Sequence, residues 1–196
     1  MKVSVFGGSQ AMEGTPAYAE ATALGDMLAR QGHTVLTGGY LGMMEAVSRG
    51  AAAAGGHVIG VTCEDIERWH GRSVNAWVME EWKKVTLVER LLVLIEGSDA
   101  ALALPGGPGT LAEVSLTWNL MIVGSLSHRP LILIGEGWRR VLDFLYEQLG
   151  PYIPPHQRGF LRFAPTAVAA VEKLSIWSIQ QNGEGTTGVN SGDADA

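Results

Sequence analysis

Residues 100–113 read AALALPGGPGTLAE, and this stretch decides the fold. An apolar run at residues 100–104 is followed by the glycine-rich segment 105–110, which opens a helix expected over residues 110–123. A turn between a strand and a helix N-terminus aims free backbone N–H groups and the positive end of the helix dipole at one place, where an anion is favoured. A turn that only reverses the chain does not need the three glycines found here within four positions. The segment therefore predicts a phosphate site.

Short apolar runs of the same kind recur along the chain and alternate with helical segments. Further strands are expected at residues 3–6, 33–37, 58–61 and 130–134, and near residues 161–163. Helices are expected at residues 16–31, 41–54, 86–96, 138–149 and 165–176. Because the strands are continuous apolar runs, they are expected to be buried on both faces, which is typical of a parallel sheet. The sequence predicts a single-domain α/β fold, a Rossmann-like doubly wound parallel sheet with helices on both faces.

The globular domain is expected to span residues 1–179. Residues 180–196, QQNGEGTTGVNSGDADA, contain almost nothing apolar and are expected to form a disordered tail. Residues 63–84 interleave charges with tryptophans and have no clear period, so no element is assigned to them.

Composition excludes several classes of function. The net charge of −6 argues against a nucleic-acid polymer as partner, because such binding depends on clustered Lys and Arg. Cys63 is the only cysteine, so an intrachain disulfide is impossible and a cytoplasmic location is expected. The chain begins directly as a strand, without the layout of a signal peptide. No apolar run approaches the ~20 residues of a membrane helix, so no membrane partner is expected.

No cofactor and no metal are expected. The five histidines have no metal-ligand spacing relative to Cys63. A nicotinamide site would require G-x-G-x-x-G after the first strand, which the sequence lacks. A pyridoxal-type decarboxylase requires a Schiff-base lysine in a protected pocket, and none of the four lysines follows a strand.

The ligand is expected at the carboxyl ends of the strands, where three glycine-bearing turns converge. Phosphate would meet the backbone of these turns, and the hydroxyl of Thr110 can add a hydrogen bond. Thr117 lies one helical turn beyond Glu113 on the same face. The candidate substrate- and phosphate-binding residues are Gly8, Ser9, Gly38, Gly39, Gly106, Gly107, Pro108, Gly109, Thr110 and Thr117.

Glu113 has two interpretations from the residues alone. Thr110 and Glu113 have the spacing of a capping box, in which the glutamate only returns a hydrogen bond to the N–H of the cap residue. A carboxylate beside a bound phosphate is otherwise placed where like charges repel. That placement is reasonable if it contacts a ribose hydroxyl or a developing positive charge.

The run PGGPGTLAE at residues 105–113 resembles the PGGxGTxxE motif of the Lonely Guy (LOG) family, the cytokinin riboside 5′-monophosphate phosphoribohydrolases. The segments VFGGS, GGYLGMMEAVSRGA and GGHVIGV follow the order of that family, and the resemblance covers about residues 2–135. It implies hydrolysis of the N-glycosidic bond of AMP or an N6-substituted AMP to free base and ribose 5-phosphate, with Glu113 catalytic. The family's dimers imply a homodimer or higher homo-oligomer, for which the helix at residues 116–123 would suit an interface.

The family's second catalytic residue is an arginine, usually within M-x-x-R-K. The corresponding residues 87–91 read LVERL, so Arg90 matches and Leu91 replaces the lysine. The alternative is a solvated helix residue behind a second capping box, Thr86 to Glu89. This departure, and the form GGYLGMME of the second turn, also resemble a sister group that includes molybdenum-cofactor carriers. A non-hydrolytic nucleotide or molybdenum-cofactor carrier is therefore the alternative function.

Overall fold

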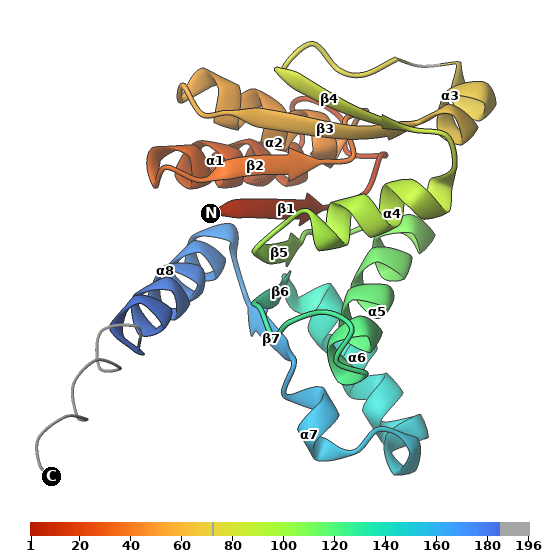
Figure 1. Cartoon of the computed structure of the whole chain (residues 1–196), viewed down its shortest axis with the longest axis vertical. Coiled ribbons are helices and arrows are strands. Elements are labelled where there is room, and N and C mark those ends of the chain that lie inside the picture. The colour runs from red at the N-terminus through yellow and green to blue at the C-terminus, as the bar shows by residue number, and fades with distance from the viewer. Residues whose placement is uncertain (72, 185–196) are drawn as a thin grey trace, which may run out of the picture.

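The computed structural model describes residues 1–71 and 73–184 and is built on one parallel sheet (Figure 1). Its seven strands are in the order β4-β3-β2-β1-β5-β6-β7, and every neighbouring pair is parallel. The predicted doubly wound α/β fold is thereby confirmed. The strands are β1 Lys2–Phe6, β2 Thr34–Thr37, β3 Val58–Cys63, β4 Glu80–Lys84, β5 Ala100–Ala103, β6 Leu131–Ile134 and β7 Leu161–Ala164.

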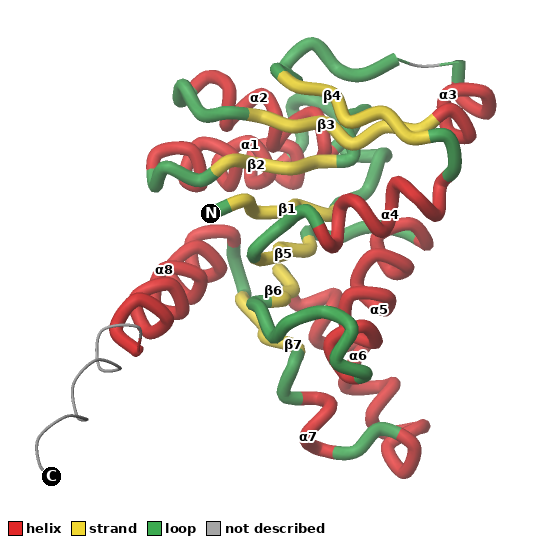
Figure 2. The backbone as a smooth tube through the Cα atoms, in the orientation of Figure 1, coloured by secondary structure: helices red, strands yellow, loops and turns green. Residues whose placement is uncertain are grey.

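Helices cover both faces of the sheet, each over its own hydrophobic cluster (Figure 2). One cluster lies beneath α1 Pro16–Arg30, α2 Met43–Ala53 and α8 Ala167–Glu184. The other lies beneath α4 Leu87–Glu96, α5 Pro108–Ile122 and α6 Glu136–Leu149. The remaining elements are the short helices α3 Glu64–His70 and α7 Pro155–Arg158 and a 3-10 turn, Gly150–Tyr152.

The strand order changes direction between β1 and β5. The chain first proceeds outward from β1 to β4, and α4 then carries it back across the sheet to β5, on the other side of β1. In open sheets of this kind, ligands bind at such a switch point, outside the carboxyl ends of the strands. The turns after β1 and β5 meet there, because Leu104 N donates to Phe6 O at 2.9 Å and Gly8 N donates to Pro105 O at 3.1 Å.

Several element boundaries differ from those expected, and three of these differences bear on the site or on the ends of the domain. Residues 63–84 contain α3 and the edge strand β4, whose sequence EEWKK has no apolar run. Helix α5 begins at Pro108, two residues before the expected start. Helix α8 continues to Glu184, eight residues beyond the expected end of the last helix at residue 176. The rest of the expected tail, residues 185–196, lies outside the described residues.

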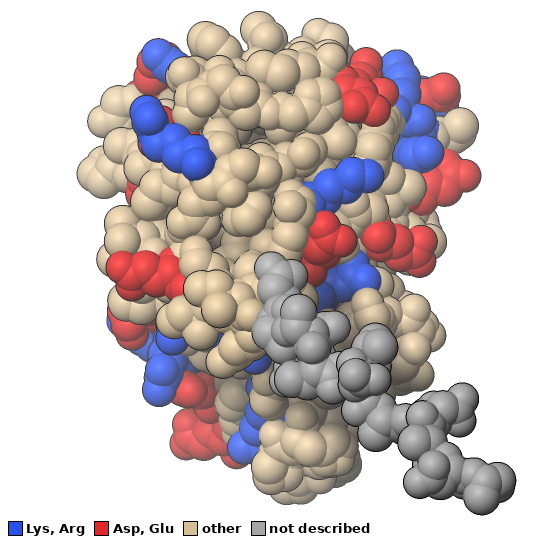
Figure 3. All heavy atoms as spheres, turned by 60° about the vertical axis from the view of Figure 1, so that its left-hand side comes forward, with Lys and Arg blue, Asp and Glu red and all other residues tan. Residues whose placement is uncertain are grey.

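The surface drawn in Figure 3 bears acidic and basic side chains interspersed, without a continuous basic stripe on that face. Among the described helices, none is long and apolar enough to cross a membrane.

Candidate active site

Three glycine-bearing turns follow β1, β2 and β5, and we number them in that order. The glycines of the first and third turns allow the two backbones to touch. A Cβ atom at Gly8 would lie 3.2 Å from Gly106 Cα, and one at Gly106 would overlap the side chain of Thr110. Gly42, at the start of α2, has a φ of +70° and packs against the backbone of Ser9. Side chains at these positions would separate the turns, so the glycines have a structural requirement of their own.

The loop of the third turn is open to solvent at the N-terminus of α5. Residues 105–109 are exposed, whereas Thr110 is buried beneath them. A Cβ atom at Gly107 or Gly109 would meet nothing within 4 Å. The N-cap is Gly107, and no side chain caps the helix. The first turn of α5 therefore presents backbone N–H groups that an anion could reach, and binding of a phosphate there stays a prediction.

Glu113 is not the partner in a capping box. Because α5 starts at Pro108, Thr110 lies inside the first turn and is not the cap. The glutamate is 7% exposed, and its Oε1 lies 3.8 Å from Nη1 of Arg90. Burial raises the pKa of Glu113 to about 7, against the opposing effect of the Arg90 cation. The carboxyl can therefore change its charge near neutral pH.

Arg90 is buried and turns inward. It is 4% exposed, so its interpretation as a solvated helix residue is wrong. Its Nε donates to Val61 O at 2.8 Å, and Nη2 donates to Gly38 O at 3.2 Å. The guanidinium carbon lies 5.7 Å from the centre of the Tyr40 ring. The expected capping box of Thr86 and Glu89 also forms, so this helix start and the buried arginine coexist.

Two further predicted positions, Gly38 and Gly39, lie in the second turn and leave room for neighbouring side chains. Gly38 and Gly39 are buried. A Cβ atom at Gly38 would overlap the guanidinium of Arg90, and one at Gly39 would lie 2.9 Å from Thr62 Cγ2. The second turn thus makes room for Arg90. The hydroxyl of Thr117 donates to Glu113 O at 2.6 Å within α5, and contact of any of these residues with a ligand stays a prediction.

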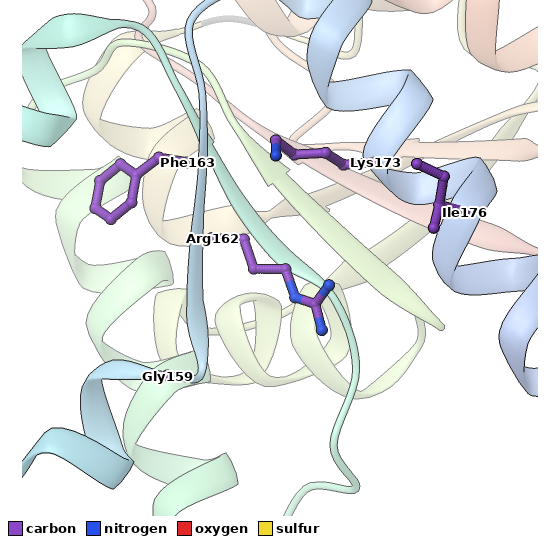
Figure 4. Close-up of a pocket in the computed structure, with 5 residues that line it drawn as sticks. All are labelled: Gly159, Arg162, Phe163, Lys173 and Ile176. Atoms are coloured by element: carbon purple, nitrogen blue, oxygen red, sulfur yellow. The ribbon is translucent and has the colours of Figure 1, made fainter.

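Two hollows are lined mostly by residues that the sequence did not single out; Ser9, a predicted binding residue, is the exception and lines the first. One, of about 350 Å³, adjoins the first turn and is lined by residues that include Gln10, Met12, Glu13, Tyr18 and Glu45. The other, of about 450 Å³, lies between β7 and α8, where Figure 4 shows Arg162 and Lys173. Within residues 1–71 and 73–184, no group of three or more His, Cys, Asp or Glu side chains could hold a metal ion.

An exposed glycine-rich loop at the switch point, with a buried Arg–Glu pair behind it, places this chain in the class of Rossmann-like α/β proteins with a candidate ligand site at the carboxyl ends of the strands. Comparisons with known proteins narrow this class. A family model described as the SLOG cluster 4 family matches residues 1–140. The chain belongs to this family of LOG-like proteins.

Two curated relatives share this family resemblance along most of their length. A probable cytokinin riboside 5′-monophosphate phosphoribohydrolase of Oryza sativa subsp. japonica is 33% identical over 180 residues, which cover 88% of this chain and 77% of the relative. A cytokinin riboside 5′-monophosphate phosphoribohydrolase of Arabidopsis thaliana is 31% identical, covering 88% and 82%. These relatives indicate a hydrolase role at the level of the family.

Solved structures include proteins with a different description. The molybdenum cofactor binding protein of Rippkaea orientalis has a TM-score of 0.68 and 26% identity, covering 91% of this chain and 96% of its own. The molybdenum cofactor carrier protein of Chlamydomonas reinhardtii has a TM-score of 0.69, 23% identity, and coverage of 91% and 98%. At 23% identity, the likeness to the Chlamydomonas reinhardtii protein concerns the fold alone.

Proposed function

We propose that this protein is a nucleoside 5′-monophosphate phosphoribohydrolase that cleaves the N-glycosidic bond of AMP or an N6-substituted AMP. The observation that carries the proposal is the buried Arg90–Glu113 pair, 3.8 Å apart, behind an exposed glycine loop. The phosphoribohydrolase function of the relatives from Oryza sativa and Arabidopsis thaliana supports it. The products are the free base and ribose 5-phosphate.

The glycine loop binds the 5′-phosphate in this proposal. Gly106, Gly107 and Gly109 let the phosphate approach the backbone, and the N-terminus of α5 favours its negative charge. Pro108 fixes the backbone at the first helical position. Binding through backbone atoms does not depend on the base, so the loop provides affinity for every nucleoside monophosphate.

Glu113 acts on the ribose as the base departs. Loss of the base leaves a positive charge spread over the ribose C1′ and ring oxygen. A carboxylate fixed in a water-poor site stabilises this charge far more than it would in water. The hydroxyl group of a water molecule then bonds to C1′, and the remaining proton of that water is transferred to the departing base. The ionised form of Glu113 is therefore the active form.

Arg90 favours the ionised form of Glu113 and faces it across the site. Its Nε and Nη2 are bonded to main-chain carbonyls, which leaves Nη1 facing Glu113. The cation lowers the pKa of Glu113, while burial raises it to about 7. The rate is therefore expected to rise with pH through the neutral range.

Free base is the direct readout of this function. Purified protein is incubated with AMP and with N6-isopentenyl-AMP, and the products are separated by chromatography. Base should appear with wild type and fall on the order of 10²-fold or more with Glu113→Gln. Glu89→Gln, on the exposed start of α4, is the matched control and should hydrolyse as wild type does. Absence of base from every purine and pyrimidine monophosphate would refute the proposal.

A molybdenum-cofactor or nucleotide carrier is the second candidate. The 26% identical structure from Rippkaea orientalis, which covers 91% of this chain, favours it. A carrier retains its ligand without turnover. Native mass spectrometry of freshly purified protein separates the two, because a molybdopterin-sized adduct supports the carrier and bound AMP or ribose phosphate supports the enzyme.

We also propose that the partners of this chain are a small-molecule monophosphate and a second copy of itself. Helices α4 and α5 are neighbours; they expose Val88 and Leu111 to solvent, and Val123, the C-cap residue of α5, is exposed as well. Burial of such residues stabilises a dimer. Light scattering should give twice the mass of one chain or a multiple of it, and Val123→Glu should reduce that mass.

A further inference from the structure

Arg90 owes its position to two carbonyl groups from different parts of the chain. Val61 O belongs to β3, whereas Gly38 O belongs to the turn after β2. The nitrogens of a guanidinium form a rigid planar fork. Once two of them are bonded, the relative placement of the two carbonyls determines where Nη1 lies relative to Glu113.

The hydroxyl of Tyr40 joins these two parts of the chain. It accepts a hydrogen bond from Cys63 N at 2.9 Å and donates one to Cys63 O at 3.0 Å. Tyr40 lies two positions after Gly38, and Cys63 lies two positions after Val61. The ring of Tyr40 also faces the Arg90 cation, an arrangement that attracts the guanidinium.

Asn75 holds the same turn from the other side. Its Nδ2 donates to Gly39 O at 3.0 Å and to Tyr40 O at 2.9 Å. Its Oδ1 accepts from Trp77 N at 3.0 Å, and its backbone N donates to Gly39 O at 2.8 Å. The side chain is buried, and a buried amide without partners would be costly. Both donor hydrogens of this amide are bonded to the turn that supplies an acceptor to Arg90.

We propose that Tyr40 and Asn75 are positioning residues, which fix the two carbonyl acceptors of Arg90 and thereby the approach of its guanidinium to Glu113. Their role in turnover rests on the proposed hydrolase function. Their effect on the Arg90–Glu113 pair is independent of that function. No motif in the sequence pointed to either residue, because both act through main-chain atoms.

Tyr40→Phe tests the hydroxyl alone, because phenylalanine keeps the ring beside Arg90. The matched control is Tyr146→Phe, since the Tyr146 hydroxyl is buried and has no hydrogen-bond partner among the described residues. Asn75→Ala tests the second contact separately. Circular dichroism and thermal unfolding establish that each variant is folded before the comparison.

The first readout is the titration of Glu113 itself. Arg90 is the charged group that lowers its pKa, and Cys63, Arg90 and Glu67 are the titratable groups that act on Tyr40. Carboxyl ¹³C shifts are followed against pH by NMR, with Glu113→Gln identifying the signal. Tyr40→Phe and Asn75→Ala should each move the midpoint to higher pH, because a displaced cation lowers the pKa less. Tyr146→Phe should leave it unchanged.

The second readout is catalysis. With AMP as substrate, kcat should fall on the order of tenfold in both variants, while KM changes little because the phosphate loop is untouched. Folded variants with a wild-type Glu113 titration would overturn the proposal. If wild type releases no base, the proposed function fails, but the NMR titration still decides whether Tyr40 and Asn75 position the pair.

Discussion

Replacement of Glu113 by glutamine should change how the free energy of unfolding depends on pH. The pKa of this carboxyl is about 7 in the folded protein and 4.5 ordinarily. Between these values the folded protein holds a proton that the unfolded chain has released, so the free energy of unfolding falls as pH rises. At about 1.4 kcal/mol per pH unit, the interval corresponds to a loss of about 3 kcal/mol.

Comparison with the variant isolates this contribution. Glutamine does not titrate, and the other ionisable groups are shared. Glutamine leaves Arg90 beside a neutral group at every pH, as protonated Glu113 does in wild type below about pH 7. Because arginine stays charged throughout this range, the curve of the variant carries no slope from this pair.

Urea unfolding between about pH 4.5 and pH 8.5 provides the assay. The stability of wild type relative to Glu113→Gln should fall by about 3 kcal/mol over this range. Glu89→Gln is the control: backbone hydrogen bonding lowers the pKa of Glu89, so its contribution is lost only as pH falls and is constant above about pH 5. Parallel curves for wild type and Glu113→Gln would refute the inference that burial raises the pKa of Glu113.

Three further predictions concern the turns and the pH profile. Gly38→Ala should destabilise the fold by about 1–3 kcal/mol and abolish hydrolysis, because its methyl group overlaps the guanidinium of Arg90; wild-type stability in thermal unfolding would contradict this. Gly106→Ala should lower the free energy of unfolding, because its Cβ atom would overlap the side chain of Thr110. Gly107→Ala has nothing within 4 Å of its Cβ atom, so it should keep the stability of wild type but weaken phosphate binding measured by calorimetry. Unchanged phosphate affinity in Gly107→Ala would exclude the loop as the phosphate site. In wild type, kcat/KM should increase with pH through about 7 as Glu113 ionises, and a profile that is flat from pH 5 to about 9 would contradict that role.

The interior strands could be predicted because both of their faces are covered. β1, β2, β3, β5 and β6 are almost wholly buried, so each contains adjacent or closely spaced apolar residues. The edge strand β4 has no such pattern, because its side chains are half-buried or exposed. Charged residues are common on edge strands, where they discourage pairing with other chains. Hydrophobic pattern alone could not identify it.

The candidate site could be predicted only where its chemistry is local. The phosphate loop is contiguous, so its motif was visible in the sequence. Glu113 was ambiguous, because the same spacing describes a capping box, and only the start of α5 at Pro108 decides between the two. The burial of Arg90 depends on Val61, in β3, and on Gly38, in the turn after β2. No local pattern reports such contacts.

The path of α4 back across the sheet has a consequence for how the protein acquires activity. The two acceptors of Arg90 lie 29 and 52 residues before it in the sequence. Contacts between distant parts of a chain form slowly, because long loops must close before the contacts can stabilise them. Helices α4 and α5 can form early, but the arginine reaches its place only after β2 and β3 have joined the sheet. During refolding, the helical signal in circular dichroism should therefore return before activity. The delay between the two measures how slowly β2 and β3 join the sheet.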